Sequence, residues 1–202
     1  SLTAELDNKK NFDANLTLYY NVINNYIFLN PQATPQLTIR GAFPSFYYQQ
    51  ANARLMGLDW SANYKIVPNF TLESRISLLR GWNRTIEDDL VLMPSDRFQT
   101  GLKFNFNQEE KSPFIRLTMT NMLEQTRVPA NTDYAAPPAA YTLFDLEAGA
   151  TFYFHKQPFE VGLAVFNLLD EQYREYLNRF RYYADELGRN VSLRLKVPFG
   201  VK

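Results

Sequence analysis

The stretch that decides the fold is Asn190–Phe199, which reads NVSLRLKVPF. Every second side chain is apolar, beginning at Val191 and ending at Phe199, and polar residues or a proline stand between them. An alternation of period two is typical of a β-strand that has one apolar and one polar face. The stretch therefore predicts an amphipathic strand.

The same alternation recurs along the whole chain, for example over 12–22, 56–66, 98–106 and 142–154. We expect strands at 1–8, 11–29, 45–66, 69–81, 96–106, 113–128, 141–154, 159–177 and 189–199. The predicted fold class is thus all-β. Most of these strands are far longer than the five or six residues that are usual in globular proteins.

Strand length and connection length point to a membrane barrel. A strand tilted by about 45° crosses a bilayer in about 9–11 residues, and only the predicted strand 1–8 is shorter. Short connections at 8–10, 67–68, 107–112 and 155–158 alternate with long ones at 30–44, 82–95, 129–140 and 178–188. This predicts a transmembrane antiparallel up-and-down β-barrel with short periplasmic turns, long extracellular loops and a periplasmic C-terminal end.

A soluble sandwich or a lipocalin-like barrel also alternates, with its apolar face turned inward. The charged polar face, as at Glu73 and Arg75, favours the membrane barrel. So does the aromatic content of 15%, because rows that end in Trp60 and Tyr64 resemble interfacial girdles. A soluble β-rich binding module stays open as an alternative.

Composition excludes several other classes. Lys plus Arg and Asp plus Glu are both 21, so no net charge attracts nucleic acid. The chain has no cysteine and a single histidine, His155, which we expect to be a turn residue rather than a metal ligand. We read the acidic run Glu87–Asp89 as a solvated loop. No catalytic motif is visible, so we expect that the chain is not an enzyme and binds no cofactor.

Two C-terminal segments carry a resemblance to a known family. Ala164–Tyr173, which reads AVFNLLDEQY, resembles the "NLFDKxY" segment of the penultimate barrel strand in TonB-dependent outer-membrane receptors. Gly188–Phe199 resembles their closing strand, and Tyr20–Ile27 and Ala53–Asp59 show weaker likenesses. The resemblance implies that Leu193, Leu195, Val197 and Phe199 form the signal that the barrel-assembly machinery reads.

Two features depart from the family pattern. Gly200–Lys202 follow Phe199, whereas the family usually ends on its aromatic residue. The family barrel has 22 strands after an N-terminal plug and a TonB box, and nothing like either occurs here. We therefore expect 1–202 to be the C-terminal part of a receptor barrel, its last nine strands, without plug and earlier strands. An autonomous barrel of about eight strands, structural or adhesive, is the alternative.

The resemblance implies active import of a scarce nutrient, such as a siderophore, cobalamin or glycan, across the outer membrane. The implied partners are the remainder of the receptor, TonB–ExbB–ExbD through the missing N-terminal part, the barrel-assembly machinery, lipopolysaccharide and outer-membrane lipid, and a surface lipoprotein. Nucleic acid is not among them.

Ligand contacts are expected in the long loops. The candidates are Tyr176, Arg179, Phe180, Arg181, Tyr182 and Tyr183 in the last loop, together with Trp82 and Tyr134. Aromatic faces suit sugar rings or catecholate planes, and arginine suits a carboxylate or an anionic chelate. The alternative is that these tyrosines belong to an interfacial girdle and that the arginines face lipopolysaccharide phosphates.

Overall fold

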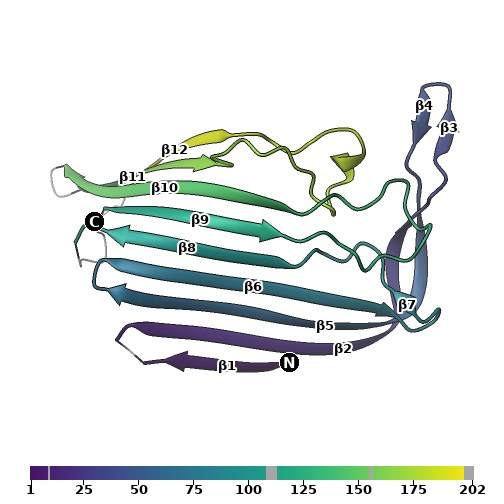
Figure 1. Cartoon of the computed structure of the whole chain (residues 1–202), viewed down its shortest axis with the longest axis horizontal. Coiled ribbons are helices and arrows are strands. Elements are labelled where there is room, and N and C mark those ends of the chain that lie inside the picture. The colour runs from purple at the N-terminus through teal and green to yellow at the C-terminus, as the bar shows by residue number, and fades with distance from the viewer. Residues whose placement is uncertain (9, 108–112, 155–156, 198–202) are drawn as a thin grey trace.

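The computed structural model describes residues 1–8, 10–107, 113–154 and 157–197. They form one curved antiparallel sheet in the order β1-β2-β5-β6-β8-β9-β10-β11-β12, in which neighbours along the chain are neighbours in space (Figure 1). The bounds are β1 (Leu2–Asp7), β2 (Phe12–Pro31), β5 (Phe46–Val67), β6 (Phe70–Asn83), β8 (Arg97–Asn105), β9 (Phe114–Met122), β10 (Tyr141–Phe154), β11 (Gln157–Phe166) and β12 (Asn190–Lys196).

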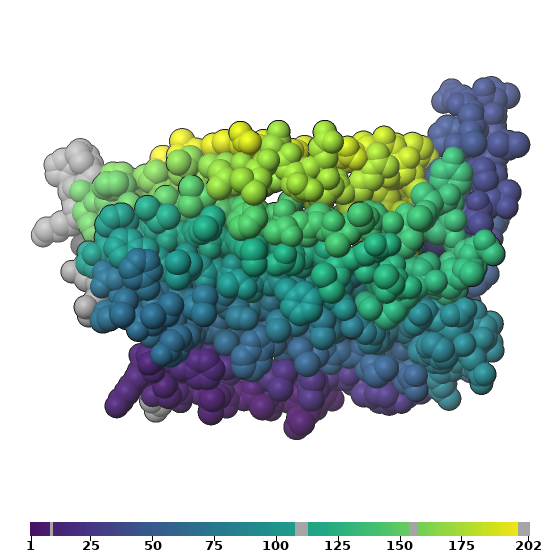
Figure 2. Space-filling view, in the orientation of Figure 1, coloured from purple at the N-terminus to yellow at the C-terminus, as the bar shows by residue number. Residues whose placement is uncertain are grey.

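Four short elements lie in the long connections. β3 (Gln36–Thr38) and β4 (Gly41–Phe43) form a hairpin that projects from the loop end of the sheet (Figures 1 and 2). β7 (Asp88–Asp89) pairs with the end of β6, and the 3₁₀ helix η1 (Arg179–Tyr182) lies in the last loop. No helix among the described residues is long and apolar enough to cross a bilayer.

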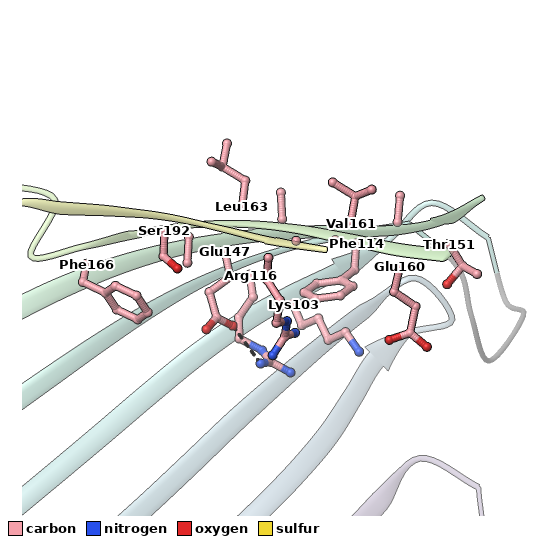
Figure 3. A pocket seen from close by; sticks show the side chains of 16 residues that line it. Lys103, Phe114, Arg116, Glu147, Thr151, Glu160, Val161, Leu163, Phe166 and Ser192 are labelled. Atoms are coloured by element: carbon pink, nitrogen blue, oxygen red, sulfur yellow. Dashed lines mark hydrogen bonds and ion pairs between the residues drawn. The ribbon is translucent and has the colours of Figure 1, made fainter. Parts of the chain in front are cut away.

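The sheet has two chemically distinct faces. One row runs in register across six strands and is wholly apolar: Leu72, Leu102, Leu117, Leu146, Val165 and Val191. On β8 and β9, which have a partner strand on either side, the same face leaves Leu102 and Leu117 each 42% exposed. Figure 3 shows Val161 and Leu163 on this side, with Glu147 and Arg116 on the other. The apolar side chains therefore face outward, as a membrane barrel requires and a soluble barrel does not.

The alternation of short and long connections is confirmed for the described residues. Pro68 and Asn69 join β5 to β6 at the turn end (Figure 1). The connections of β2 to β5, β6 to β8, β9 to β10 and β11 to β12 lie at the opposite end. Within the described residues β1 and β12 each pair on one side only, so the sheet is open at both edges.

The prediction that a strand runs over 113–128 is wrong at its end, because β9 stops at Met122. Its two neighbours stop at the same level: Arg97 and Tyr141 are the last residues that pair with Met122. Beyond them stand Pro94 and 137–138, whose prolines have no N–H to donate to a ladder. The residues after Met122 therefore have no strand to pair with.

The prediction that a strand runs over 159–177 is also wrong at its end, because β11 stops at Phe166. Asn167 and Asp170 adopt φ values of 50° and 59°, which lie in the left-handed region and cannot continue a strand. Asparagine and aspartate tolerate this region better than other non-glycine residues. The segment that resembles the family motif is thus a strand end followed by a turn.

Candidate functional site

The turn after β11 fixes the start of the last loop. Asn167 is 4% exposed. Its side-chain amide donates to the backbone oxygen of Glu171 at 2.9 Å, and its side-chain oxygen accepts from the backbone N–H of Glu171 at 2.8 Å. Asp170 accepts from the backbone N–H of Arg189 at 2.8 Å, and the Arg189 side chain donates to the Leu168 oxygen at 2.9 Å. The segment 167–170 therefore joins both ends of the loop.

A buried ion pair joins this loop to the preceding long loop. Arg181 and Asp133 have side chains that are 3% and 6% exposed, and the guanidinium pairs with the carboxylate. Arg181 also donates to the backbone oxygen of Ala136 at 3.1 Å. The Tyr182 hydroxyl donates to the other carboxylate oxygen at 2.7 Å. Because each charged group has several partners, the pair is fully satisfied in spite of its burial.

Aromatic rings extend the contact from this ion pair. The Tyr182 ring lies edge-to-face with Phe46 and with Tyr134, each at 6.1 Å between centroids. The Arg181 guanidinium lies 4.4 Å from the Tyr182 ring and 5.0 Å from the Tyr176 ring. These contacts bring three distant segments together: the start of β5, the loop 123–140 and the last loop. We call this set, Phe46, Asp133, Tyr134, Tyr176, Arg181 and Tyr182, the loop cluster.

Two phenols of the loop cluster, those of Tyr176 and Tyr182, stay protonated at neutral pH. Burial, and then the hydrogen bond to Asp133, raise the pKa of Tyr182 well above its usual value. Burial likewise raises the pKa of Tyr176, and the Asp133 charge adds to the effect. A neutral Tyr182 remains a hydrogen-bond donor to the carboxylate, which is the arrangement that the ion pair needs.

The predicted ligand residues differ in exposure. Tyr176 and Arg181 are 5% and 4% exposed, so they are buried and not open to solvent. Arg179 lies over the Phe46 ring at 5.2 Å, and Phe180 and Tyr183 are 73% and 58% exposed. The exposed residues form the rim of the loop cluster; Tyr134 is 39% exposed beside Tyr182.

Trp82 lies apart from the loop cluster. It is at the loop end of β6 on the outward row, where it is paired with Arg54 of β5. The Arg54 guanidinium is 6.0 Å from its ring. Sequence reasoning missed Asp133 and Phe46. Neither has a local signal, since one is an aspartate in a polar loop and the other begins a strand.

The inward face carries a hollow of about 530 Å³ that the sequence did not predict (Figure 3). Gly149 and Gly162 form a cross-strand pair in its wall. A Cβ on Gly149 would come within 2.6 Å of the Phe114 ring, so the absence of a side chain lets that ring lie across β10. Arg116, at the edge of the hollow, pairs with Glu147 at 3.0 Å and with Glu73 at 3.2 Å.

No group of three or more histidine, cysteine, aspartate or glutamate side chains in the described ranges could hold a metal ion. His155, the predicted turn residue, lies outside the described residues. So does Phe199 of the predicted barrel-assembly signal. Of the other residues of that signal, Leu193 and Leu195 lie on the outward row of β12, and Val197 follows the last residue of β12.

Comparison with known proteins identifies the fold. A model described as "TonB dependent receptor-like, beta-barrel" matches residues 1–168, most of the chain. The chain belongs to the TonB-dependent receptor β-barrel family. A search among curated proteins gives no match by sequence.

Two solved structures of TonB-dependent receptors agree with this membership. The copper transporter OprC superposes with a TM-score of 0.77 at 18% identity, over 98% of this chain and 30% of its own. BauA, the ferric preacinetobactin receptor from Acinetobacter baumannii, gives 0.64 at 14% identity, over 96% of this chain and 28% of its own. The chain thus spans less than a third of these receptors, and at this identity the likeness concerns the fold.

Proposed function

We propose that this chain forms barrel wall and surface loops of a TonB-dependent receptor that imports a scarce nutrient across the outer membrane. The observation that carries the proposal is the two-faced sheet, with exposed leucines on one face and ion-paired charges on the other. Such a sheet is stable when lipid covers the apolar face and water reaches the polar one. Family membership supports the transport role.

The proposal includes a larger barrel around this sheet. β1 and β12 are unpaired on one side within the described residues. An unpaired backbone group in hydrocarbon costs several kcal/mol, so an open edge needs further strands. This supports the C-terminal-part assignment over an autonomous small barrel. TonB and its energising partners would act through parts of the receptor outside this chain, and no chemical step on the cargo is required.

The exposed rim of the loop cluster is the proposed ligand contact. Arg179, Phe180 and Tyr183 offer one guanidinium and two aromatic faces to the outside. This combination suits a cargo with a planar or ring-shaped body and an anionic group, such as a catecholate chelate or an acidic glycan. Tyr176 and Arg181 would then support the rim from beneath.

Uptake by cells that express the full-length receptor tests the proposal. A panel of labelled ferric siderophores, cobalamin and oligosaccharides is offered to strains with and without TonB. We expect one cargo class to enter only when TonB is present, and an Arg179→Ala/Phe180→Ala variant to weaken its binding about tenfold or more. Arg84→Ala, in the β6–β8 connection, is the matched control. Uptake that is independent of TonB contradicts the proposal.

A further inference from the structure

The outward rows of the long strands contain very few charges. Among the described residues of these strands, Arg54 on β5 and Arg80 on β6 are the only charged residues that share a face with the apolar row. Val22 and Trp82 flank Arg54 across the ladder, and Met56 is the partner of Arg80. Two neighbouring arginines thus interrupt an otherwise apolar surface at one place.

Arg54 has no anionic partner in the described part of the chain. Its guanidinium forms no ion pair there, and its buried Nε has no hydrogen-bond acceptor. The guanidinium lies 6.0 Å from the centre of the Trp82 ring. Asp89 is the ladder partner of Trp82 but forms no ion pair with Arg54. A partly buried guanidinium without a counter-charge is costly, most of all on a surface that faces lipid.

The acidic group beside Arg80 is already committed. Asp96 is 7% exposed and accepts two hydrogen bonds from Arg80, at 2.5 and 2.8 Å. It accepts a further one from Arg127 at 3.0 Å. One carboxylate therefore serves two guanidiniums and is not available to Arg54. The local surface suits an anion supplied from outside the protein.

The position of Arg54 agrees with a membrane interface. Tyr64, on the same outward row, lies ten residues nearer the turn end of β5. Ten residues of strand span about 33 Å, or about 23 Å along the membrane normal at a tilt of 45°. The apolar band of an outer-membrane barrel is about 25 Å tall. If Tyr64 marks the periplasmic interface, Arg54 reaches the outer one.

We propose that Arg54, beside the ion-paired Arg80, binds a phosphate group of an anionic lipid in the outer leaflet. The inference rests on the proposed outer-membrane location. Arginine is suited to this task because its planar fork donates two parallel hydrogen bonds to phosphate and it is less strongly hydrated than lysine. The Trp82 ring beside Arg54 suits the interfacial region, where an amphipathic ring has both apolar and wet surroundings.

Native mass spectrometry of the full-length receptor in mild detergent tests the proposal. The probes are lipid A with two phosphates and the same lipid after its phosphates have been removed. We expect the receptor to retain the phosphorylated lipid preferentially and Arg54→Gln to weaken this binding about tenfold, which corresponds to about 1.4 kcal/mol. Arg54→Lys should restore part of the binding, since it keeps the charge but not the fork.

Arg75→Gln is the matched control, because Arg75 is on β6 like Arg80 but on the inward face. It should bind the phosphorylated lipid like the unaltered receptor. Equal retention of both lipids, or equal binding by Arg54→Gln and the unaltered receptor, would overturn the proposal. TonB-dependent uptake measured on the same variants separates the two proposals: if lipid selectivity fails while uptake persists, only the lipid site is wrong.

Discussion

Replacing Arg181 by methionine should detach the last loop from the loop 123–140. The change removes a guanidinium that is 3% exposed and leaves the Asp133 carboxylate, 6% exposed, with the Tyr182 hydroxyl as its remaining side-chain partner. Breaking a buried ion pair by removing one member costs about 3–5 kcal/mol, mainly because the remaining charge is buried without compensation. The Asp133 carboxylate can relieve this cost only if the loops separate and expose it to water.

The expected size of the effect follows from that cost. A loss of about 3 kcal/mol raises the population of the open loop by about two orders of magnitude. Hydrogen exchange of the full-length receptor in detergent measures this opening, because amides in 129–140 and 178–188 exchange through it. We expect their protection to fall by about 100-fold or more, while amides in β5 and β6 keep theirs.

A double variant distinguishes charge burial from simple loss of packing. Arg181→Met with Asp133→Leu removes both charges and replaces them with apolar side chains, which is often neutral or stabilising. It should recover most of the protection. Exchange in Arg181→Met that matches the unaltered receptor, or no recovery in the double variant, would refute the account of the loop cluster.

Three further predictions concern the sheet and the loop tyrosines. Leu193→Arg, on the outward face of β12, should cost up to about 2–4 kcal/mol of folding stability in lipid. Ser192→Arg, on the inward face, should cost close to none. Urea titration of the receptor in vesicles measures both costs. Gly149→Leu should displace the Phe114 ring and cost about 1–3 kcal/mol by overpacking, measured in the same titration. Gly162→Leu, on the neighbouring strand, is the comparison, because a Cβ there would meet no atom nearer than 3.8 Å. The folded-state pKa of Tyr182 is raised, so the stability that its hydroxyl contributes is present below about pH 10 and declines as the pH rises above that value. Proteolysis of the loop should therefore accelerate at alkaline pH in the unaltered receptor. In Tyr182→Phe the acceleration should be much smaller.

The sheet was largely predictable from the sequence, because a strand with one face in lipid and one in water has to alternate. Val191, Leu193 and Leu195 carry that signal without help from distant residues. The two wrong strand ends have different causes. Beyond Met122 the neighbouring strands stop, and at Asn167 a side chain that bonds to the Glu171 backbone ends the strand locally. The first cause cannot be read from one segment alone.

The loop cluster was predictable only in part. The density of tyrosine and arginine in 176–183 singled out Tyr176, Arg181 and Tyr182 as ligand candidates, and the structure brings these three side chains into contact with one another. It did not show that Asp133, 48 positions away, would bury Arg181. That pairing depends on how two loops fold over the end of the sheet. Whether Arg179, Phe180 and Tyr183 touch cargo stays a prediction.

The central claim, that the apolar rows face lipid and the polar rows face water, is tested most directly on β12. The chain itself has no cysteine. Single cysteines at 191 to 195, in a full-length receptor in which any cysteine outside this chain has been replaced, can therefore carry spin labels in reconstituted vesicles. The account predicts that labels at 191, 193 and 195 collide mainly with oxygen dissolved in lipid, and labels at 192 and 194 mainly with a water-soluble nickel complex. Equal shielding of both sets, or the reverse pattern, would contradict it.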